Sequence, residues 1–233
     1  MQTLSERIEI LARWMCEAER VVIFTGAGIS TDSGLPDFRG PDGVWTREEK
    51  GLPPRNGKKD WSKSDPNISH TAIVDLQSMG KLHFLVSQNI DNLHLSSGIE
   101  FERLAELHGN VARSRCSRCE ETYPKEDAPD TCECGGSLKS SVVGFGDQLP
   151  VKDIEMSFAS ARTCDLMIVL GSSLVVTPAA TVPVLASDAG ARLVIVNQGE
   201  TPLDSFVDLR FEEGIADVFP PAVERLKILL SNE

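Results

Sequence analysis

Residues 21–30 read VVIFTGAGIS, an apolar run of strand-forming residues that leads directly into a turn with two glycines. A short, continuous apolar run of this kind is typical of a strand buried on both faces. Glycines directly after such a strand allow backbone N–H groups to approach a pyrophosphate. On spacing alone, a simple turn is an equally good reading, because Gly34 is displaced from the third position of G-x-G-x-x-G. No G-K-S/T ending follows, so a dinucleotide is a better ligand prediction than a nucleoside triphosphate.

Three further apolar runs follow at residues 82–86, 166–170 and 193–196, separated by segments with helical spacing of apolar residues. These segments predict helices over residues 4–15, 70–79, 153–162, 179–187 and 221–230. Ser69 is the predicted N-cap of the second helix, Gly80 its end, and Pro221 the first residue of the last. The alternation predicts an α/β fold with a doubly wound parallel sheet.

Two segments interrupt this alternation. Residues 36–67 are rich in Pro, Gly, Lys and Asp, which predicts a long ordered loop or a small helical insert over a site. The other segment carries four of the six cysteines, spaced as C-x2-C at Cys116 and Cys119 and as C-x-C-G-G at Cys132 and Cys134. It has too few apolar residues for a core, and four thiolates at this spacing predict a structural zinc site of the ribbon type. The second pair is one residue shorter than the usual C-x-x-C, which tightens that turn.

Length and charge exclude several classes of protein. With 233 residues, the chain fits one large core plus a small module. Its 23 basic and 35 acidic residues give a net charge of −12, which disfavours general nucleic-acid binding and docking on an anionic membrane. The N-terminus lacks the pattern of a signal peptide and no run of about 18 apolar residues occurs, so the sequence predicts a cytoplasmic protein.

Small and polar residues follow the other predicted strands, as QNIDN at 88–92, GSS at 171–173 and Asn197. Ligands of open α/β sheets bind at these carboxyl ends, and such residues suit ribose hydroxyls and carboxamides. Residues that merely cap strands explain any one of these groups, but explain all of them together less well. His108 precedes the cysteine segment and has the chemistry of a general base, although a lone histidine is more often structural.

Taken together, these motifs resemble the sirtuins, a family of NAD-dependent protein lysine deacylases. The matching stretches are GAGIS at 26–30, GLPDFR at 34–39, QNIDNLH at 88–94, LHG at 107–109, the four cysteines, GSSL at 171–174 and VN at 196–197. They cover nearly the whole chain in the family's order. The short connection from Arg39 to Ser69, with Gly43-Val44-Trp45-Thr46, is most similar to the branch that contains the human chromatin-associated sirtuin.

The resemblance implies a Rossmann-like NAD-binding domain, a small zinc-ribbon module and a helical or loop insert. The implied boundaries are residues 1–40, 69–112 and 142–233 for the NAD-binding domain, 113–141 for the four-cysteine module and 41–68 for a cofactor-binding insert. NAD is implied as co-substrate, together with one structural zinc ion held by Cys116, Cys119, Cys132 and Cys134.

The resemblance also implies a reaction and its residues. In sirtuins the acyl-lysine oxygen attacks C1′ of the nicotinamide ribose, nicotinamide leaves, and a histidine then helps to deprotonate a ribose hydroxyl. The implied products are deacylated lysine, nicotinamide and O-acyl-ADP-ribose. The implied catalytic residues are His108, Asn89 and Asp91. The implied cofactor contacts are Gly26, Ala27, Gly28, Ser30, Asp37, Phe38, Arg39, Trp45, Gln88, Asn89, Asp91, Gly171, Ser172, Ser173, Asn197 and Ile215.

An acyl-lysine peptide is expected to add as a strand between the two domains, with contacts from Val143, Gly144, Phe145 and Gly146. Gly144 stands where sirtuins often have a larger residue, and Asp147 where glutamate is common. Phe145 is either a wall of the acyl channel or an aromatic residue of a core strand. Sirtuins that remove succinyl or malonyl groups use a Tyr/Arg pair, whereas the one tyrosine here, Tyr123, lies in the cysteine segment, so neutral acyl groups are expected.

Two other function classes stay open at this stage. The same site would also serve protein ADP-ribosyl transfer or NAD hydrolysis, and a noncatalytic NAD-sensing module is the third class. The presence of His108, Asn89 and Asp91 counts against the noncatalytic module. The protein target, the oligomeric state and the affinity for NAD do not follow from the sequence.

Overall fold

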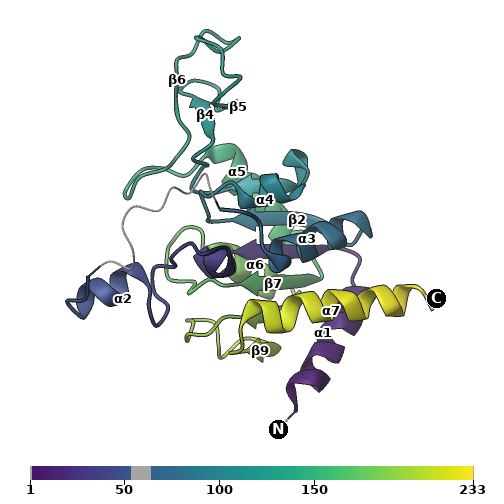
Figure 1. Cartoon of the computed structure of the whole chain (residues 1–233). Helices are drawn as coiled ribbons and strands as arrows, with labels where there is room; N and C mark the ends of the chain where they lie inside the picture. The colour runs from purple at the N-terminus through teal and green to yellow at the C-terminus, as the bar shows by residue number, and fades with distance from the viewer. Residues whose placement is uncertain (1, 54–63, 233) are drawn as a thin grey trace.

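The computed structural model describes residues 2–53 and 64–232, and its large domain is built on a parallel sheet (Figure 1). Six strands pair in the order β3-β2-β1-β7-β8-β9, and every pair is parallel. They are β1 (Val21–Thr25), β2 (Leu82–Ser87), β3 (Leu104–Glu106), β7 (Leu166–Leu170), β8 (Arg192–Val196) and β9 (Leu209–Phe211). The predicted doubly wound α/β sheet is therefore confirmed.

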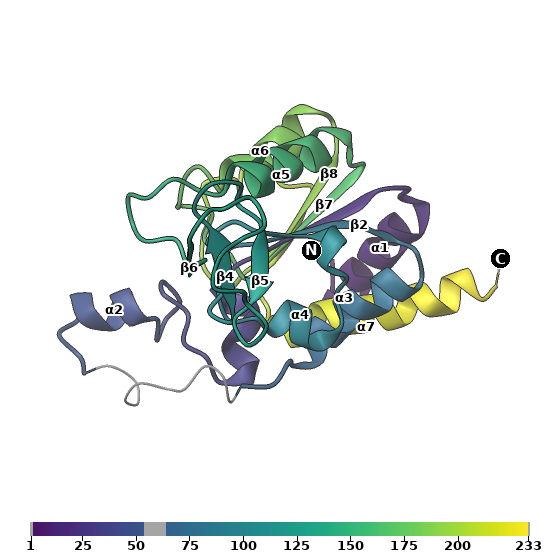
Figure 2. The same cartoon turned by 90° about the horizontal axis from the view of Figure 1, so that it is seen from above.

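Helices cover both faces of this sheet. The helices of the described residues are α1 (Leu4–Glu17), α2 (Val44–Glu49), α3 (Ile68–Ser78), α4 (Leu93–Ser97), α5 (Val151–Thr163), α6 (Thr181–Asp188) and α7 (Ile215–Leu230), with the short 3₁₀ helices η1 (Ala27–Ser33) and η3 (Phe101–Arg103), and α2 lies away from the sheet (Figure 1). Helices α1, α3 and α7 pack on one face, and α5 and α6 on the other (Figure 2). Among the described residues, no helix is long and apolar enough to cross a membrane.

The central strand β1 shows why both faces need helices. All five of its residues are buried, and its four apolar residues alternate between two hydrophobic clusters. Val21 and Ile23 belong to the cluster under α1, α3 and α7, whereas Val22 and Phe24 belong to the cluster under α5 and α6. Successive side chains of a strand point to opposite faces, so an uninterrupted apolar strand requires a hydrophobic layer on each side.

Three details differ from the predictions. The N-cap of α3 is Asn67 rather than Ser69, because the Asn67 side chain accepts the N–H groups of Ser69 and His70. Helix α7 begins at Ile215, so Pro220 and Pro221 lie inside it rather than at its start. Burial of apolar side chains in its first turns, each worth about 1.5–3 kcal/mol, offsets the cost of about 3 kcal/mol for a proline inside a helix.

The third difference concerns short elements. The strands β3 and β9 have three residues each and were not predicted, because so few residues show no recognisable alternation. The glycine turn after β1 opens the 3₁₀ helix η1, not an α-helix. Part of the predicted insert forms α2, whereas residues 54–63 of it lie outside the described residues.

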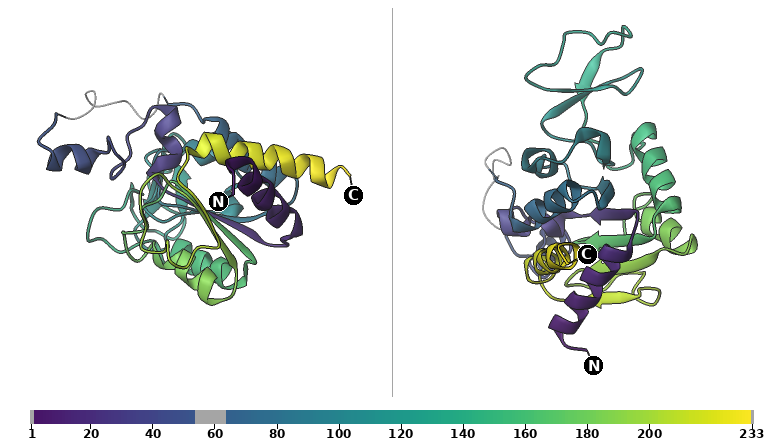
Figure 3. Two further views of the ribbon diagram at one scale, coloured as in Figure 1. Left: turned by 90° about the horizontal axis from the view of Figure 1, so that it is seen from below. Right: turned by 90° about the vertical axis from the view of Figure 1, so that its right-hand side faces the viewer.

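The cysteine segment forms a separate antiparallel sheet. Its strands are β4 (Arg113–Cys116), β5 (Thr122–Pro124) and β6 (Leu138–Ser140), in the order β5-β4-β6. This small module stands away from the large domain, as the right-hand view of Figure 3 shows. Within residues 113–141 the buried hydrophobic side chains are those of Cys116 and Cys132, so the module has almost no apolar core.

Candidate functional site

A cleft with a volume of about 720 Å³ runs along the carboxyl ends of the parallel strands. It brings together every residue for which the sequence predicted a catalytic, cofactor or substrate contact. These are Gly26, Ala27, Gly28, Ser30, Asp37, Phe38, Arg39, Trp45, Gln88, Asn89, Asp91, His108, Val143, Gly144, Phe145, Gly146, Gly171, Ser172, Ser173, Asn197 and Ile215. Residues from nine separate stretches of sequence, at 26–30, 37–39, 45, 88–91, 108, 143–146, 171–173, 197 and 215, thus converge on one cavity.

The floor of the cleft requires glycine at three positions. The N–H of Gly28 donates to the carbonyl of Gly171 at 2.9 Å, so the ends of β1 and β7 are in direct backbone contact. A Cβ atom on Gly26 would lie 2.7 Å from the carbonyl oxygen of Gly171, and a Cβ atom on Gly28 would lie 2.7 Å from the Cα of Gly171. Gly171 itself has φ +66°, a conformation that side chains rarely adopt. The two loops pack this closely only because these three positions carry no side chain.

Polar side chains from η1 and from the segment after β2 form one hydrogen-bonded group in the cleft. The Ser30 hydroxyl donates to Asp91 Oδ2 at 2.7 Å, and Asn89 Nδ2 donates to the Ser30 Oγ and to the Gly26 carbonyl at 3.2 Å each. Asn89 and Asp91 are both buried, with exposures of 9% and 7%. Gln88 Nε2 donates to Ser172 Oγ at 2.7 Å, which connects the ends of β2 and β7. The group presents amide and carboxylate functions at fixed, largely buried positions.

His108 follows β3 and is the one imidazole that lines the cleft among the described residues. Its Nδ1 lies 2.8 Å from the carbonyl oxygen of Gln88. Because a carbonyl only accepts hydrogen bonds, Nδ1 carries the proton, and Nε2 keeps a free lone pair. Burial lowers the pKa of His108, so the ring is neutral near pH 7. A neutral, oriented imidazole is the form that a general base requires.

Two histidines that the sequence analysis did not assign lie beneath this group, and both are buried. His94 Nε2 is 2.9 Å from the Thr25 hydroxyl, which donates to Ser87 Oγ at 3.0 Å, and Ser87 Oγ also accepts the N–H of Asn89. The ring of His70 lies 5.0 Å from that of His94. A buried polar chain therefore supports the backbone of Asn89 from below. Only the fold brings β1, β2, α3 and α4 together, so no sequence pattern could show this arrangement.

The two buried histidines contribute stability that is lost in acid. Burial lowers the pKa of His70 to about 4 and that of His94 well below 6.5, so between about pH 6.5 and pH 4 these two groups bind more protons in the unfolded chain than in the folded chain. Their contribution to stability therefore rises with pH in this window, by up to about 1.4 kcal/mol per pH unit for each group, whereas Glu106, whose pKa burial raises to about 7, contributes a slope of opposite sign. Urea unfolding from pH 7 to pH 4.5 of wild type and of His70→Gln isolates the contribution of His70. His70→Gln should lose less stability on acidification than wild type, and an identical pH dependence of the two proteins would contradict the assignment.

Three aromatic rings form one lip of the cleft. Trp45 of α2 packs against Phe38 at 4.9 Å and against Phe145 at 5.8 Å between ring centroids. The Arg39 guanidinium lies over the Trp45 ring at 4.2 Å. Phe145 is 86% exposed, so its alternative reading as a core aromatic is wrong. Rings presented to solvent at the edge of a cleft are suited to cover an apolar ligand group.

The segment that carries Phe145 is attached directly to the segment of the cleft histidine. The N–H of Val143 donates to the carbonyl of His108 at 2.9 Å. A tight turn follows, in which Asp147 accepts the N–H of Gly144 at 3.0 Å and returns its own N–H to the Gly144 carbonyl at 3.1 Å. The two departures from the family pattern, Gly144 and Asp147, are thus partners in one turn. A Cβ atom on Gly144 would lie 2.8 Å from Asp147 Oδ2, so glycine and aspartate suit each other here.

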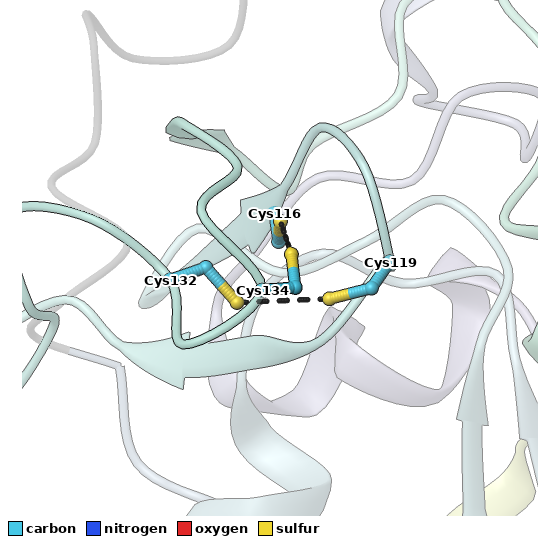
Figure 4. A group of neighbouring side chains, drawn as sticks. All are labelled: Cys116, Cys119, Cys132 and Cys134. Atoms are coloured by element: carbon cyan, nitrogen blue, oxygen red, sulfur yellow. Dashed lines mark hydrogen bonds between the residues drawn. The ribbon is translucent and has the colours of Figure 1, made fainter.

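The four cysteines of the module meet as Figure 4 shows. All four Sγ atoms lie within 4.8 Å of one another, with Cys116 and Cys134 at 3.5 Å and Cys119 and Cys132 at 3.6 Å. A zinc ion with Zn–S bonds of about 2.3 Å in a tetrahedron places its sulfurs about 3.8 Å apart. Backbone N–H groups of Cys119 and Arg118 lower the pKa of Cys116 to about 6, which favours the thiolate that a metal binds. The donor set fits a closed, structural zinc site.

A buried cluster joins the module to the strand before His108. Glu106 of β3 accepts a hydrogen bond from Asn110, and Arg115 of β4 pairs with Asp153 of α5 at 3.1 Å. Burial raises the pKa of Glu106 to about 7. Sequence reasoning missed this cluster, because its charged residues are far apart in the chain and give no local pattern.

Other cleft residues were also missed. Thr31 and Asp32 extend the wall formed by η1, Gln198, Gly199 and Glu200 continue from Asn197, and Gly214 precedes Ile215. Residues 198–200 follow directly after the end of β8, and this position is the sequence signal that indicates them as cleft residues, as it does for Asn197.

Comparison with known proteins agrees with this geometry. The model of the Sir2 family matches residues 54–178, more than half of the chain. The chain belongs to the Sir2 family. The Sir2 protein solved in complex with a p53 peptide and NAD⁺ superposes on this chain with a TM-score of 0.72 at 33% identity, covering 99% of this chain and 98% of that one. The crystal structure of a Sir2 homolog–NAD complex gives a TM-score of 0.76 at 32% identity over 95% and 94% of the two chains.

Among curated Sir2 relatives, NAD-dependent protein deacetylase 1 of Bradyrhizobium diazoefficiens is 38% identical, over 94% of this chain and 96% of its own length. NAD-dependent protein deacetylase SRT1 of Oryza sativa subsp. indica is 40% identical over 89% of this chain. This chain spans 46% of the length of the rice protein, so it corresponds to about half of that relative.

Proposed function

We propose that this Sir2 protein is an NAD-dependent protein lysine deacylase that acts as a deacetylase and accepts longer aliphatic acyl groups. The observation that carries the proposal is the position of His108, whose Nε2 is free while Nδ1 is held by Gln88, in the same cleft as Asn89 and Asp91. Relatives of nearly the same length are named NAD-dependent deacetylases and deacylases, which supports the same activity.

In this proposal NAD supplies a ribosyl centre from which nicotinamide leaves, and the protein positions the reactants. Asn89 and Asp91, fixed by Ser30, hold the ribose and the carboxamide. Gln88 contacts the ribose, and the backbone around Gly26, Gly28 and Gly171 approaches the phosphates. His108 accepts a ribose proton at Nε2, and its bond to Gln88 stabilises the resulting cation.

The substrate segment is proposed to be Val143 to Gly146, against which an acyl-lysine peptide would pair as an added strand. The four cysteines would hold one zinc ion that orders the module. The proposal includes the domain boundaries. The NAD-binding domain comprises residues 1–40, 69–112 and 142–233, the zinc module residues 113–141 and the insert residues 41–68. A cytoplasmic location is also part of the proposal.

The decisive experiment separates the proposed reaction from its alternatives. The protein is incubated with NAD and an acetyl-lysine peptide, and the products are identified by mass spectrometry. O-acetyl-ADP-ribose together with the deacetylated peptide supports the proposal. A mass increase of protein or peptide by ADP-ribose would instead indicate ADP-ribosyl transfer, and ADP-ribose alone would indicate NAD hydrolysis. Unchanged NAD would overturn the proposal.

The finer placement, next to the branch of the human chromatin-associated sirtuin, is a proposal that rests on the short connection after Arg39 and on Trp45 in α2. The named relatives come from plants, bacteria and archaea. With this placement we expect long aliphatic acyl chains to be accepted beside acetyl, because each buried CH₂ contributes about 0.8 kcal/mol.

Acyl selectivity is a specific prediction. Phe38, Trp45 and Phe145 offer an apolar lip, and Tyr123 lies 3.3 Å from Cys132 Sγ, so it does not line the cleft. Arg39 is the one arginine or lysine among the described residues that line the cleft, and its guanidinium already stacks on the Trp45 ring. Burial of an anionic acyl group that is not paired with a cation costs several kcal/mol, so acetyl, butyryl and myristoyl peptides should all exceed succinyl in kcat/KM. A matched peptide series at saturating NAD measures this order. If the succinyl peptide is the best substrate, the preference for neutral acyl groups is wrong. If kcat/KM falls steadily from acetyl to myristoyl, the acceptance of long chains is wrong.

A further inference from the structure

Arg210 of β9 makes an unusual set of hydrogen bonds behind one wall of the cleft. Its Nη1 donates to the carbonyl oxygens of Asn197, at 2.7 Å, and Phe211, and its Nη2 donates to the carbonyl of Gly199 at 2.6 Å. Nε donates to Asp204 Oδ1 at 3.1 Å. One guanidinium therefore contacts three backbone carbonyls and one carboxylate.

Two of the three carbonyls that Arg210 contacts, those of Asn197 and Gly199, belong to the segment that lines the cleft. After β8 the chain forms no helix or strand until β9, yet Asn197, Gln198, Gly199 and Glu200 all face the cavity. Converging carbonyl oxygens repel one another, and a buried carbonyl without a donor is costly. Arg210 supplies the donors, since the planar guanidinium directs its N–H groups in fixed directions. Asp204 neutralises the charge and is itself held by Thr201.

Arg210 is not among the residues that line the cavity, so it does not act by touching a ligand. We infer that Arg210 is a positioning residue, which fixes the segment 197–200 as the wall that receives the part of NAD farthest from the nicotinamide ribose at His108, which is the adenosine half. This inference rests on NAD being the ligand of the cleft, as proposed above.

The sheet order decides which step this wall affects. His108 follows β3, whereas Asn197 follows β8, four strands away in the order β3-β2-β1-β7-β8. At about 4.8 Å between neighbouring strands, the two ends of the cleft are separated by about 19 Å. Loss of the wall should therefore weaken binding of the cofactor without changing the chemistry at His108.

Arg210→Gln tests the inference, with Arg192→Gln as a matched control. Arg192 is the first residue of β8, at the end opposite to Asn197, where it is half exposed and pairs with Glu17 at 2.8 Å. Its substitution therefore removes the same charge as Arg210→Gln but far from the cleft. We expect Arg210→Gln to raise the KM for NAD and the Kd for ADP-ribose about tenfold, the loss typical of hydrogen bonds to a charged group. The kcat at saturating NAD, the KM for the acyl peptide and inhibition by nicotinamide should stay within about twofold of wild type. Arg192→Gln should resemble wild type.

A purely structural role would give a different pattern. If Arg210→Gln lowers kcat and peptide affinity as much as NAD affinity, or if a folded variant binds ADP-ribose like wild type, the inference is wrong. Arg210→Lys keeps the charge but not the planar fork and should lie between wild type and Arg210→Gln. If Arg210→Gln does not fold, the same measurements are made with Asp204→Asn, which leaves the guanidinium without its carboxylate and should shift NAD binding in the same direction. Calorimetry of wild type with ADP-ribose separates the two proposals, because no binding by wild type would contradict the function itself.

Discussion

His108→Ala should reduce deacylation by about 10²–10⁴-fold, the usual contribution of a general base, while the fold and NAD binding persist. His108 is partly exposed in the cleft and makes one side-chain hydrogen bond, to the carbonyl of Gln88, so its removal leaves the core intact. Steady-state kcat/KM with an acetyl peptide, calorimetric binding of ADP-ribose and a thermal unfolding curve give the three readouts.

The position of His108 in the reaction sharpens this prediction. In the proposed reaction the base acts after nicotinamide has left, so exchange of labelled nicotinamide into NAD should survive in His108→Ala when product formation does not. His83→Ala is the matched control, because His83 is an exposed histidine on β2 outside the cleft. Full deacylase activity in purified His108→Ala would contradict the assignment of His108 as base. An equal loss of nicotinamide exchange and of deacylation would contradict it as well.

Cys116→Ser should abolish zinc binding, unfold the small module and reduce activity by at least about tenfold. The module of residues 113–141 buries almost no apolar side chains besides Cys116 and Cys132, so the metal supplies most of its stability. Unfolding of the module should also lower activity, because β6 leads directly into Val143, whose N–H donates to the carbonyl of His108. Metal analysis should find one equivalent of zinc in wild type and almost none in the variant.

Hydrogen exchange can locate the effect of Cys116→Ser. Amides of residues 113–141 should lose protection, whereas the strands of the large sheet should keep theirs. Cys164→Ser is the control, since Cys164 is also buried but lies in the large domain and bonds to the Ala161 carbonyl. Zinc-free wild type that keeps full activity in strong chelators would refute the structural role of the metal.

The local sequence determined the large elements and the identity of the site. Continuous apolar runs such as residues 21–24 and 166–170 specify buried parallel strands, because no other element buries a short run on both faces. The cysteine spacing specified the ligand set, since C-x2-C and C-x-C hold their thiolates within one turn of chain. The motifs after the strands indicated the cleft residues, because parallel strands end at one edge of the sheet.

The tertiary structure decided what depends on residues distant in sequence. Strands β3 and β9 are three residues long and exist only because a neighbouring strand offers its hydrogen bonds. The tautomer of His108 is set by the Gln88 carbonyl 20 residues earlier, and the wall at Asn197 is held by Arg210 from the edge strand. Phe145 is exposed on the lip rather than buried, because the tight turn between Gly144 and Asp147 directs it toward Trp45. A sequence pattern reports the periodicity of one segment, whereas hydrogen bonds and burial between segments depend on which strands the fold places side by side.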